Sequence, residues 1–527
     1  MRGTSIAGVG AIDDSTPAGR LAAPALATLL CALVVRLGWR GSDLPAQMFR
    51  ADLVRRNGVV LWNNLWYGGH TTLDYGLLTP VLSAITGPVL LAAASTVVAA
   101  EMFGRILRAA FVQHWRPGVL VFAAAVVVNV IVGRVPFALG LALGLIAVRM
   151  LQRDRPVLAA LAGLAASASS PVAGAFVVLA VLSWGAARRH ARYVAVAVAA
   201  ASAAPVVAGM LLYPQAGHFP MRGAALAWDL GVAAVVFTLA FLDDRRELAI
   251  ASALYGLACV AAFVVSSPLG GNVSRLGQFV AAPLVLTMLI RRRWLLMAFV
   301  LAVPLVVWQW TPAVDTAVAA GRDPSTQQDY YEPLVAFLVA QPGSPTRTEI
   351  PFTFRHWETA YVADTVPLAR GWERQLDIAR NPAFYDGTLD AATYHAWLLD
   401  NAVAYVALPD ARLDPSSFGE RLLLQQGVPG LEEIWRDAHW RVWRVNDDRG
   451  LVDGPAVAVA LGATDVHLEV LGSGSLLVRL RYSDHWQLDG PGCVRQSPGG
   501  WIEIEGARPG ALVLSQGLRG STCPNVS

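Results

Sequence analysis

About eleven apolar runs fill residues 21–312, and they require this chain to place most of its helices in a membrane. A helix needs about 20 apolar residues to cross a bilayer, and somewhat fewer where a helix pair turns back within it. Of the 527 residues, 55% are hydrophobic and only 15% are charged, which is too apolar for a soluble protein. The runs are 21–38, 77–99, 118–133, 136–150, 157–169, 172–187, 193–213, 224–242, 247–266, 276–290 and 294–312.

Dense arginine clusters separate these runs and indicate which loops are cytoplasmic. Ser169, Ser170 and Pro171 interrupt the stretch 157–187, which favours two short helices over one long tilted helix. With two crossings there, every dense cluster falls in an alternate loop, as the positive-inside rule expects of cytoplasmic loops. The clusters are Arg105/Arg108/Arg116, Arg149/Arg153/Arg155, Arg188/Arg189/Arg192, Arg245/Arg246 and Arg291/Arg292/Arg293.

This number of crossings predicts a cytoplasmic N-terminal tail at 1–20 and a membrane core at 21–313. Residues 1–19 are polar, and no small-residue cleavage site follows the first run, so we expect that run to be a retained span. The loops expected outside include 39–76, 214–223 and 267–275. The net charge of +3 is too small to suggest nucleic-acid binding.

The same number of crossings places the C-terminal part outside the membrane. This part lacks the long apolar runs of the membrane core. Residues 314–454 mix strand-like alternation, as in "YVALPD" and "WRVWRV", with helical spacing, which predicts an α/β domain. Residues 455–527 contain short alternating strands broken by glycine and proline, which predicts a β-sandwich. Cys493 and Cys523 both lie there, and we expect them to form a disulfide, which requires an oxidising compartment.

The first external loop, 39–76, holds the densest polar and aromatic chemistry. "SDLPAQMFRADLVRRNG" predicts a helix that begins with Ser42 or Asp43 as its cap and ends at Gly58. Two readings of the following "LWNNLWYGGHTTLDYG" stay open: an aromatic belt at the membrane surface, or a sugar site, where rings stack on the sugar and polar groups bind its hydroxyls. The expected sugar-binding side chains are Trp62, Asn63, Trp66, Tyr67, His70 and Asp74.

Two arginines are expected near the external ends of helices. Arg275 in "GGNVSRLGQF" either snorkels to the membrane surface or binds the phosphate of a lipid carrier, for which a guanidinium fork is suited. Asn272, beside it, is an expected substrate ligand. Arg134 in "GRVPF" is a similar candidate. His218 in "QAGHFPMRG" is either a solvated loop residue or a substrate ligand. GxxxxGK[ST], GxSxG, HExxH and CxxC are absent, so a nucleotide-driven pump, a familiar serine hydrolase and a structural zinc site lack support.

Taken in order, these segments resemble the GT-C superfamily of integral-membrane glycosyltransferases. They are also similar to the related bacterial membrane family named for a 6-pyruvoyl-tetrahydropterin-synthase-related domain. The resemblance covers roughly residues 20–312 and rests on "GVVLWNNLWYGGHTTLDYGLLTP", "GRVPF", "SSPVAGAF" and "GGNVSRLGQFVAAPL", after an external acid and before an external mixed domain.

The resemblance implies a bacterial inner-membrane enzyme that transfers a sugar from a polyprenyl-phosphate donor to a cell-envelope glycan or glycolipid on the outer face. Asp43 matches the acid that deprotonates the acceptor hydroxyl, and Arg275 matches a contact to the donor phosphate. A divalent cation such as Mg²⁺ or Mn²⁺ sometimes accompanies that acid. Two other interpretations stay open: an inactive scaffold in envelope assembly, and a transporter or flippase of lipid-linked sugar.

Overall fold

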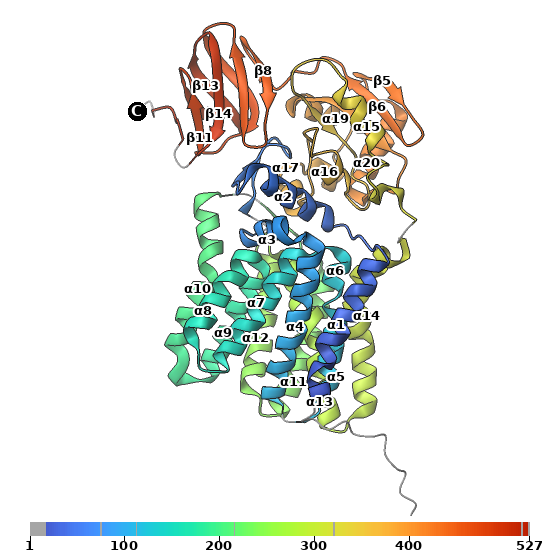
Figure 1. Ribbon diagram of the computed structural model, residues 1–527, viewed down its shortest axis with the longest axis vertical. Coiled ribbons are helices and arrows are strands. Elements are labelled where there is room, and N and C mark those ends of the chain that lie inside the picture. The colour runs from blue at the N-terminus through green and yellow to red at the C-terminus, as the bar shows by residue number, and fades with distance from the viewer. Residues whose placement is uncertain are drawn as a thin grey trace, which may run out of the picture.

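The computed structural model describes residues 17–73, 76–111, 113–214, 217–319, 322–517 and 520–524. A group of long helices forms one end of the molecule, and two strand-containing domains formed by the C-terminal part lie together at the other end (Figure 1). The first loop of the chain, with the short helices α2 and α3, lies between these two layers. Its position already shows that this loop joins the helices to the C-terminal domains.

Within the described residues, seven helices are long and apolar enough to cross a membrane, by length and composition. They are α1 (Pro17–Arg36), α4 (Pro88–Ala110), α10 (Arg192–Leu212), α11 (Gly223–Leu242), α12 (Arg246–Val264), α13 (Ser274–Arg291) and α14 (Leu295–Ala319). The chain is therefore a multi-pass membrane protein in its helical part. These seven account for part of the eleven spans expected from the sequence.

The other expected spans are helical but shorter. They are α5 (Arg116–Ala125) with α6 (Val128–Val132), α7 (Val135–Leu151), α8 (Pro156–Ser169) and α9 (Pro171–Ala187). Because α8 has 14 residues, its length of about 21 Å is less than a hydrocarbon core of about 30 Å. Residues 157–187 form two helices, α8 and α9, which meet at Ser170.

The span expected at 77–99 is displaced. Gly87, with φ of +85°, and Pro88 separate a short helix α3 (Leu78–Thr86) from the long helix α4. Proline has no backbone N–H to continue the preceding helix, so the pair imposes a break there. The long helix consequently extends to Ala110, well beyond the expected end.

The arginine clusters gather at the end of the helices away from the C-terminal domains. At the end of α13, Arg292 Nε lies 2.8 Å from an oxygen of Asp243, which follows α11. At the end of α9, Arg188 lies 3.4 Å from Glu247 at the start of α12. Alternate helix ends therefore meet on one face, as the positive-inside reading of the sequence requires.

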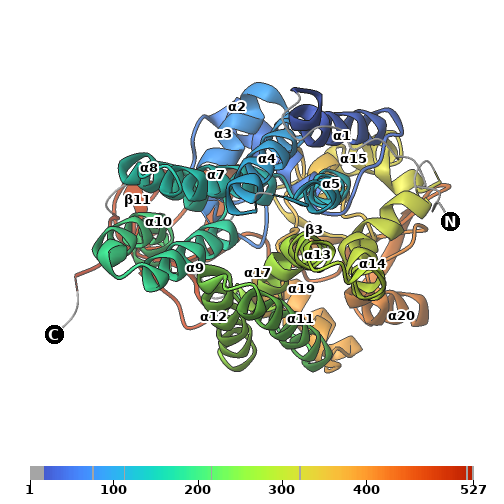
Figure 2. The same cartoon turned by 90° about the horizontal axis from the view of Figure 1, so that it is seen from below.

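Helix α13 is the most enclosed of the seven membrane helices. In the most apolar stretch of α13, 67% of the residues are buried. In the corresponding stretches of the other six helices, 17–33% of the residues are buried. Viewed along the bundle, it lies among α5, α11 and α14 (Figure 2). Helix α13, whose first turn carries Arg275, therefore lies in the interior of the bundle.

The α/β domain follows α14 and contains one mixed sheet. Its strand order is β3-β4-β6-β5, in which β3 (Arg347–Glu349) runs parallel to β4 (Val403–Pro409) and the remaining pairs are antiparallel. The edge strands are β3 and β5 (Leu431–Arg436), and β6 (Trp440–Val445) lies between β4 and β5. The helices of the domain are α15 (Glu332–Val339), α16 (Glu358–Tyr361), α17 (Arg374–Arg380), α18 (Ala383–Asp386), α19 (Ala391–Asp400) and α20 (Phe418–Gln426).

A buried charge cluster lies in the core of this domain. The Arg370 guanidinium contacts Glu349 at 3.3 Å, Asp377 at 2.9 Å and Glu420 at 3.4 Å, and all four side chains are fully buried. Burial raises the pKa of Glu420 to about 7, although Arg370 opposes the shift. The charge-rich segment 355–377 thus contributes to the domain core.

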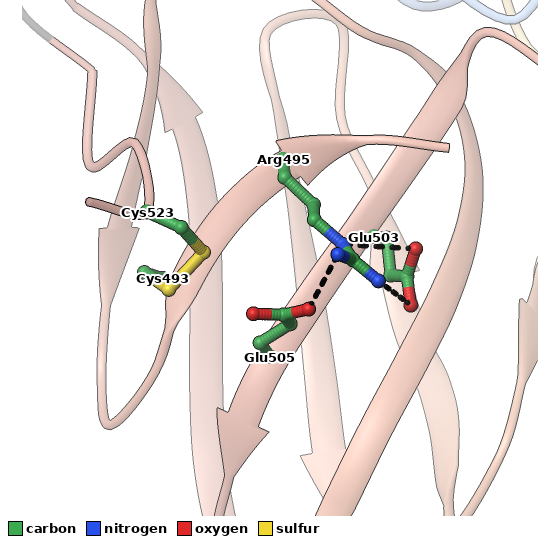
Figure 3. Close-up of a disulfide and its surroundings, with 5 residues drawn as sticks. All are labelled: Cys493, Arg495, Glu503, Glu505 and Cys523. Carbon is green, nitrogen blue, oxygen red and sulfur yellow. Dashed lines mark hydrogen bonds and ion pairs between the residues drawn. A yellow bond between two sulfur atoms is a disulfide. The ribbon is translucent and has the colours of Figure 1, made fainter. Parts of the chain in front are cut away.

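The last domain is a β-sandwich of two four-stranded sheets, in the orders β12-β13-β10-β7 and β11-β14-β9-β8. A disulfide joins Cys493 and Cys523, the pair expected from the sequence, and fastens the end of the chain to β12 (Figure 3). Beside it, Arg495 pairs with Glu503 and Glu505 of β13. The strands are β7 (Val452–Asp453), β8 (Ala456–Leu461), β9 (Asp465–Val470), β10 (Gly474–Arg481), β11 (Trp486–Asp489), β12 (Cys493–Gln496), β13 (Trp501–Ala507) and β14 (Gly510–Gln516).

Candidate active site at the domain-side end of the helices

The backbone before α2 (Leu44–Asn57) is held tightly against the turn between α6 and α7. The Asp43 N–H donates to the carbonyl of Val132 at 3.0 Å. A Cβ on Gly41 would lie 2.4 Å from the carbonyl oxygen of Ile131, and one on Gly133 would lie 2.3 Å from the backbone nitrogen of Leu44. Only glycine permits two backbones to approach this closely, so these two residues fix where Asp43 sits.

Asp43 stands at the N-cap position of α2, but its side chain makes no capping hydrogen bond. Its carboxylate instead faces Arg134, with 3.6 Å between Oδ2 and the arginine Nε. The Asp43 side chain is 33% exposed, whereas that of Arg134 is 16% exposed. The carboxylate is therefore accessible, and its cationic neighbour lies deeper.

Arg134 is an unusual arginine because its nitrogen atoms are buried with few partners. Among the described residues, neither Nε nor Nη1 has a hydrogen-bond acceptor. Burial lowers the pKa of the Arg134 guanidinium, and the neighbouring Asp43 carboxylate opposes that shift. A buried guanidinium with unused donors favours an anionic ligand beside it.

Arg275 reaches the same region from the start of α13. Its guanidinium carbon lies 5.4 Å from the ring centroid of Phe137, in the first turn of α7, three residues after Arg134. Phe137 also stacks on Phe279 of α13, with centroids 5.8 Å apart. Phe137 therefore connects Arg275 with the turn that carries Arg134, which in turn faces Asp43.

The start of α13 is anchored by a carboxylate within the helices. Asp229 of α11 accepts a hydrogen bond from the hydroxyl of Tyr255 at 3.0 Å and from Ser274 Oγ, directly before Arg275. The Asp229 side chain is fully buried. This explains the acid inside a span: it ties α11, α12 and α13 together and so positions Arg275.

Residues 60–72 form a second part of the first loop and pack into the C-terminal domains. We call this part the embedded loop. Its strands β1 (Trp62–Asn63) and β2 (His70–Thr71) form a short hairpin. At its centre the fully buried Trp66 stacks on Phe49 of α2, with centroids 4.3 Å apart, and on His70 at 5.7 Å. A Cβ on Gly371 would lie 2.4 Å from the Trp66 ring, so the α/β domain closes directly over it.

The embedded loop also bonds to both C-terminal domains. The hydroxyl of Tyr67 donates to the carbonyl of Gly371, and the side-chain amide of Asn64 donates to the carbonyls of Gly462 and Asp465, at 3.2 and 3.3 Å. Trp62 joins the core of the β-sandwich. These contacts make the loop a connection between the domains.

These contacts correct the expectation that the aromatic residues form the wall of a sugar pocket. Trp62, Asn63, Trp66, Tyr67 and His70 are all buried, with at most 4% of each residue exposed. Their ring faces are covered by other side chains, and Asn63 Oδ1 accepts from the backbone of Leu65 at 3.0 Å. A sugar has no access to them in this arrangement. Asp74 lies outside the described residues.

Two other expected ligands make contacts within the protein. The side-chain amide of Asn272 is buried and donates to the carbonyl of Pro268 at 3.1 Å, so it stabilises its own turn. The backbone N–H of His218 donates to the carbonyl of Gln375 at 3.0 Å, which joins the loop before α11 to the α/β domain.

Arg50 of α2 makes a buried contact with the α/β domain that was not expected from the sequence. Its guanidinium lies 3.3 Å from Glu373 of the α/β domain, and both side chains are buried, at 3% and 4% exposed. It also lies 5.5 Å from the Trp66 centroid. Its position on the helix face opposite Arg55 and Arg56 gave no clear signal, because its partner is distant in the chain.

Among the described residues, one group of potential metal ligands comes together: Cys493, Glu505 and Cys523. Both sulfur atoms belong to the disulfide, so this group is not a metal site (Figure 3). Among the described residues, the ion pair of Asp43 is with Arg134, and a single carboxylate facing a guanidinium is a poor set of protein ligands for Mg²⁺ or Mn²⁺.

No protein-family model and no curated protein matches the chain. A similar solved structure is a cryo-EM structure of a mutant form of the arabinofuranosyltransferase AftD from Mycobacteria, which is 16% identical with a TM-score of 0.44. The match covers 97% of this chain and 42% of that chain, so this chain spans about two fifths of its length. So distant a likeness supports no inference about activity, and the resemblance to the 6-pyruvoyl-tetrahydropterin-synthase-related family stays a prediction.

Proposed function

We propose that this protein is a membrane glycosyltransferase that moves a sugar from a polyprenyl-phosphate donor to a cell-envelope glycan or glycolipid. The observation that carries the proposal is the group formed by Asp43, Arg134 and Arg275 at the domain-side end of the membrane helices. It combines an accessible carboxylate with two guanidinium groups where a lipid phosphate at the bilayer surface could reach them.

In the proposed reaction, Asp43 accepts the proton of the acceptor hydroxyl. The acceptor oxygen forms a bond to the anomeric carbon of the sugar while the bond from that carbon to the phosphate oxygen breaks. The lipid phosphate leaves with the bonding electrons, and its growing negative charge is stabilised by Arg134 and Arg275. The pairing of Asp43 with Arg134 orients the carboxylate before the acceptor arrives.

The proposed orientation places the arginine-rich end in the cytoplasm of a bacterial cell and the C-terminal domains outside its inner membrane. The common face of the arginine clusters supports it. The disulfide between Cys493 and Cys523 supports an oxidising, external location for the last domain. We include all eleven helical passages as membrane spans in this proposal, with the short helices α8 and α9 as a hairpin.

A divalent cation could join this reaction only by bridging Asp43 and the donor phosphate, because the described residues provide one acid there. Transfer measured with excess EDTA, with and without added Mg²⁺ or Mn²⁺, tests this point. Activity that survives EDTA unchanged shows that the two arginines alone balance the phosphate charge.

The test of the function compares Asp43→Asn with Asp52→Asn in proteoliposomes supplied with a panel of polyprenyl-phosphate-linked pentoses and hexoses. Asp52 is an acid of the same helix that pairs with Arg55 at the surface, 2.5 Å away. We expect Asp43→Asn to lower the transfer rate by about 10²–10⁴, and Asp52→Asn to keep it within about twofold of the wild type. Wild-type transfer rates in both variants would contradict the role of Asp43, and no transfer by the wild type from any donor in the panel would support a scaffold.

The alternative of a lipid-linked sugar flippase makes a different prediction in the same vesicles. A flippase would move a fluorescent donor lipid between leaflets without forming a glycosidic bond. Movement without transfer, insensitive to Asp43→Asn, would replace the enzyme proposal with that alternative.

A further inference from the structure

A cavity of about 190 Å³ lies at the arginine-rich end of the helices, opposite the candidate active site. It is enclosed by the start of α1, the last turns of α4 and the start of α5. The residues that line it are Gly19, Arg20, Ala22, Ala23, Ala100, Glu101, Gly104, Arg105, Arg108, Trp115, Arg116, Val119 and Leu120. Nothing in the proposed transfer reaction uses this cavity.

Four arginines and one glutamate line the cavity. Glu101 is already paired with Arg105, Nε to Oε1 at 2.6 Å. In the part of the chain that the structure describes, neither Arg20 nor Arg108 has a carboxylate partner. The cavity therefore favours an anion.

Trp115 holds two of these arginines in place. The Trp115 ring is buried, and the guanidinium carbons of Arg108 and Arg116 lie 5.8 and 5.7 Å from its centroid. Guanidinium groups fixed against an aromatic face lose less rotamer entropy when they bind an anion. The arrangement is thus prepared for a phosphate oxygen.

The rest of the wall is apolar and narrow. Ala22, Ala23, Ala100 and Gly104 leave the space between α1 and α4, and Val119 and Leu120 of α5 close it. At about 190 Å³ the cavity is smaller than the roughly 300–1,000 Å³ that encloses a drug-sized ligand. It suits a phosphate headgroup whose chains continue along the apolar helices.

We propose that this cavity binds the phosphate headgroup of an anionic phospholipid of the leaflet at the arginine-rich end. General attraction of arginines to an anionic leaflet acts over any exposed cluster. The cavity adds a defined place, with Arg108 and Arg116 on Trp115 above apolar walls. Free inorganic phosphate is also an anion, but it has no acyl chains that could contact the apolar walls. This proposal does not depend on the glycosyltransferase activity.

The experiment measures phosphatidylglycerol retained by the full-length protein, by native mass spectrometry after reconstitution into phosphatidylcholine vesicles containing phosphatidylglycerol. The variant is Arg108→Gln/Arg116→Gln. The matched control is Arg153→Gln/Arg155→Gln, which removes the same charge from exposed positions between α7 and α8, outside the cavity. A third variant, Ala22→Leu, fills the exposed mouth of the cavity without changing its charge.

We expect Arg108→Gln/Arg116→Gln to lower the affinity for phosphatidylglycerol about tenfold or more, from roughly 1 kcal/mol per arginine near the surface. Ala22→Leu should weaken retention in the same direction, whereas the control should change it less than twofold. Equal losses in the variant and the control would overturn the proposal, because leaflet electrostatics alone would then explain binding. Displacement of the lipid by millimolar inorganic phosphate would also overturn it.

Discussion

The first loop of this protein contains two parts that are neighbours in sequence and opposite in character. The embedded loop, residues 60–72, is rich in rings and amides, and nearly all of these groups are buried against the C-terminal domains. Asp43, at the other end of α2, has few partners and remains accessible beside Arg134. The richer chemistry serves to hold the domains together, and the sparser chemistry is available for a substrate.

A high density of polar and aromatic side chains therefore does not by itself identify a binding site. A ring or an amide that finds a partner within the chain is satisfied, and burying it stabilises the fold. A charged group whose hydrogen-bonding capacity is unfilled points more directly to a ligand.

Trp66→Ala should have the largest effect on stability. The ring is fully buried between Phe49 and the α/β domain, so its removal leaves a cavity and should lower the free energy of unfolding by about 3–5 kcal/mol. Thermal unfolding of the full chain in neutral detergent measures this. Trp294→Ala, at a tryptophan that is 47% exposed, serves as the control. Equal destabilisation by both variants would contradict the structural role of the buried Trp66 ring.

Acid should weaken the embedded loop through His70. Burial, with Arg50 and Arg380 nearby, lowers the pKa of His70 well below its usual value, so the folded state keeps it neutral. Below the unfolded pKa of about 6.5 the unfolded chain binds the extra proton, and stability falls as the pH falls. At pH 5 the loss should approach about 2 kcal/mol.

His70→Phe keeps a ring between Trp66 and Tyr67 but cannot titrate. The difference in unfolding temperature between this variant and the wild type should therefore change between pH 7.5 and pH 5. Other buried acids of the tail, such as Glu420, titrate in both proteins and cancel in this difference. A difference that is constant with pH would show that His70 is not held neutral.

Asn64→Ala should have an intermediate effect. It removes two hydrogen bonds to the β-sandwich and leaves Trp62 Nε1 without its acceptor, at present Asn64 Oδ1 at 2.8 Å. We expect a loss of about 1–3 kcal/mol in thermal unfolding. Asn57→Ala is the matched control, because Asn57 bonds only within α2, to the carbonyl of Leu53.

Asp43→Asn should have the smallest effect on stability. Its ion pair with Arg134 is long and partly exposed, so its loss should change the free energy of unfolding by less than about 1 kcal/mol. The same variant should nearly abolish transfer. A large destabilisation, comparable to that of Trp66→Ala, would place Asp43 with the structural residues and remove the distinction between the two parts.

Much of the fold follows from local sequence signals. Helix α2 lies between Asp43 and Gly58, within a residue of expectation. Gly58, with φ of +73°, is a local determinant of its end, whereas the Asp43 side chain makes no capping hydrogen bond. The strands of the β-sandwich follow their period-two alternation, as "AVAVAL" becomes β8. The break at Gly87-Pro88 was also readable, but the continuous apolar run concealed it.

The candidate site was predictable only in part. Asp43 and Arg275 stand out by charge at the edges of apolar runs, but no local signal indicates that Arg134 pairs with Asp43. The burial of Trp62 could not be predicted, since it depends on Trp486, whose ring packs edge-on 5.9 Å away and lies in a different domain. Sequence shows which groups a loop carries, and only packing shows which are already satisfied.

The most direct test of the account is a double-mutant cycle between Asp43 and Arg275, measured as kcat/KM for transfer from a polyprenyl-phosphate sugar in proteoliposomes. If Asp43→Asn and Arg275→Gln act on one bound donor, the double variant should be about tenfold or more active than the product of the single effects predicts. Independent effects that multiply within experimental error would contradict a shared site.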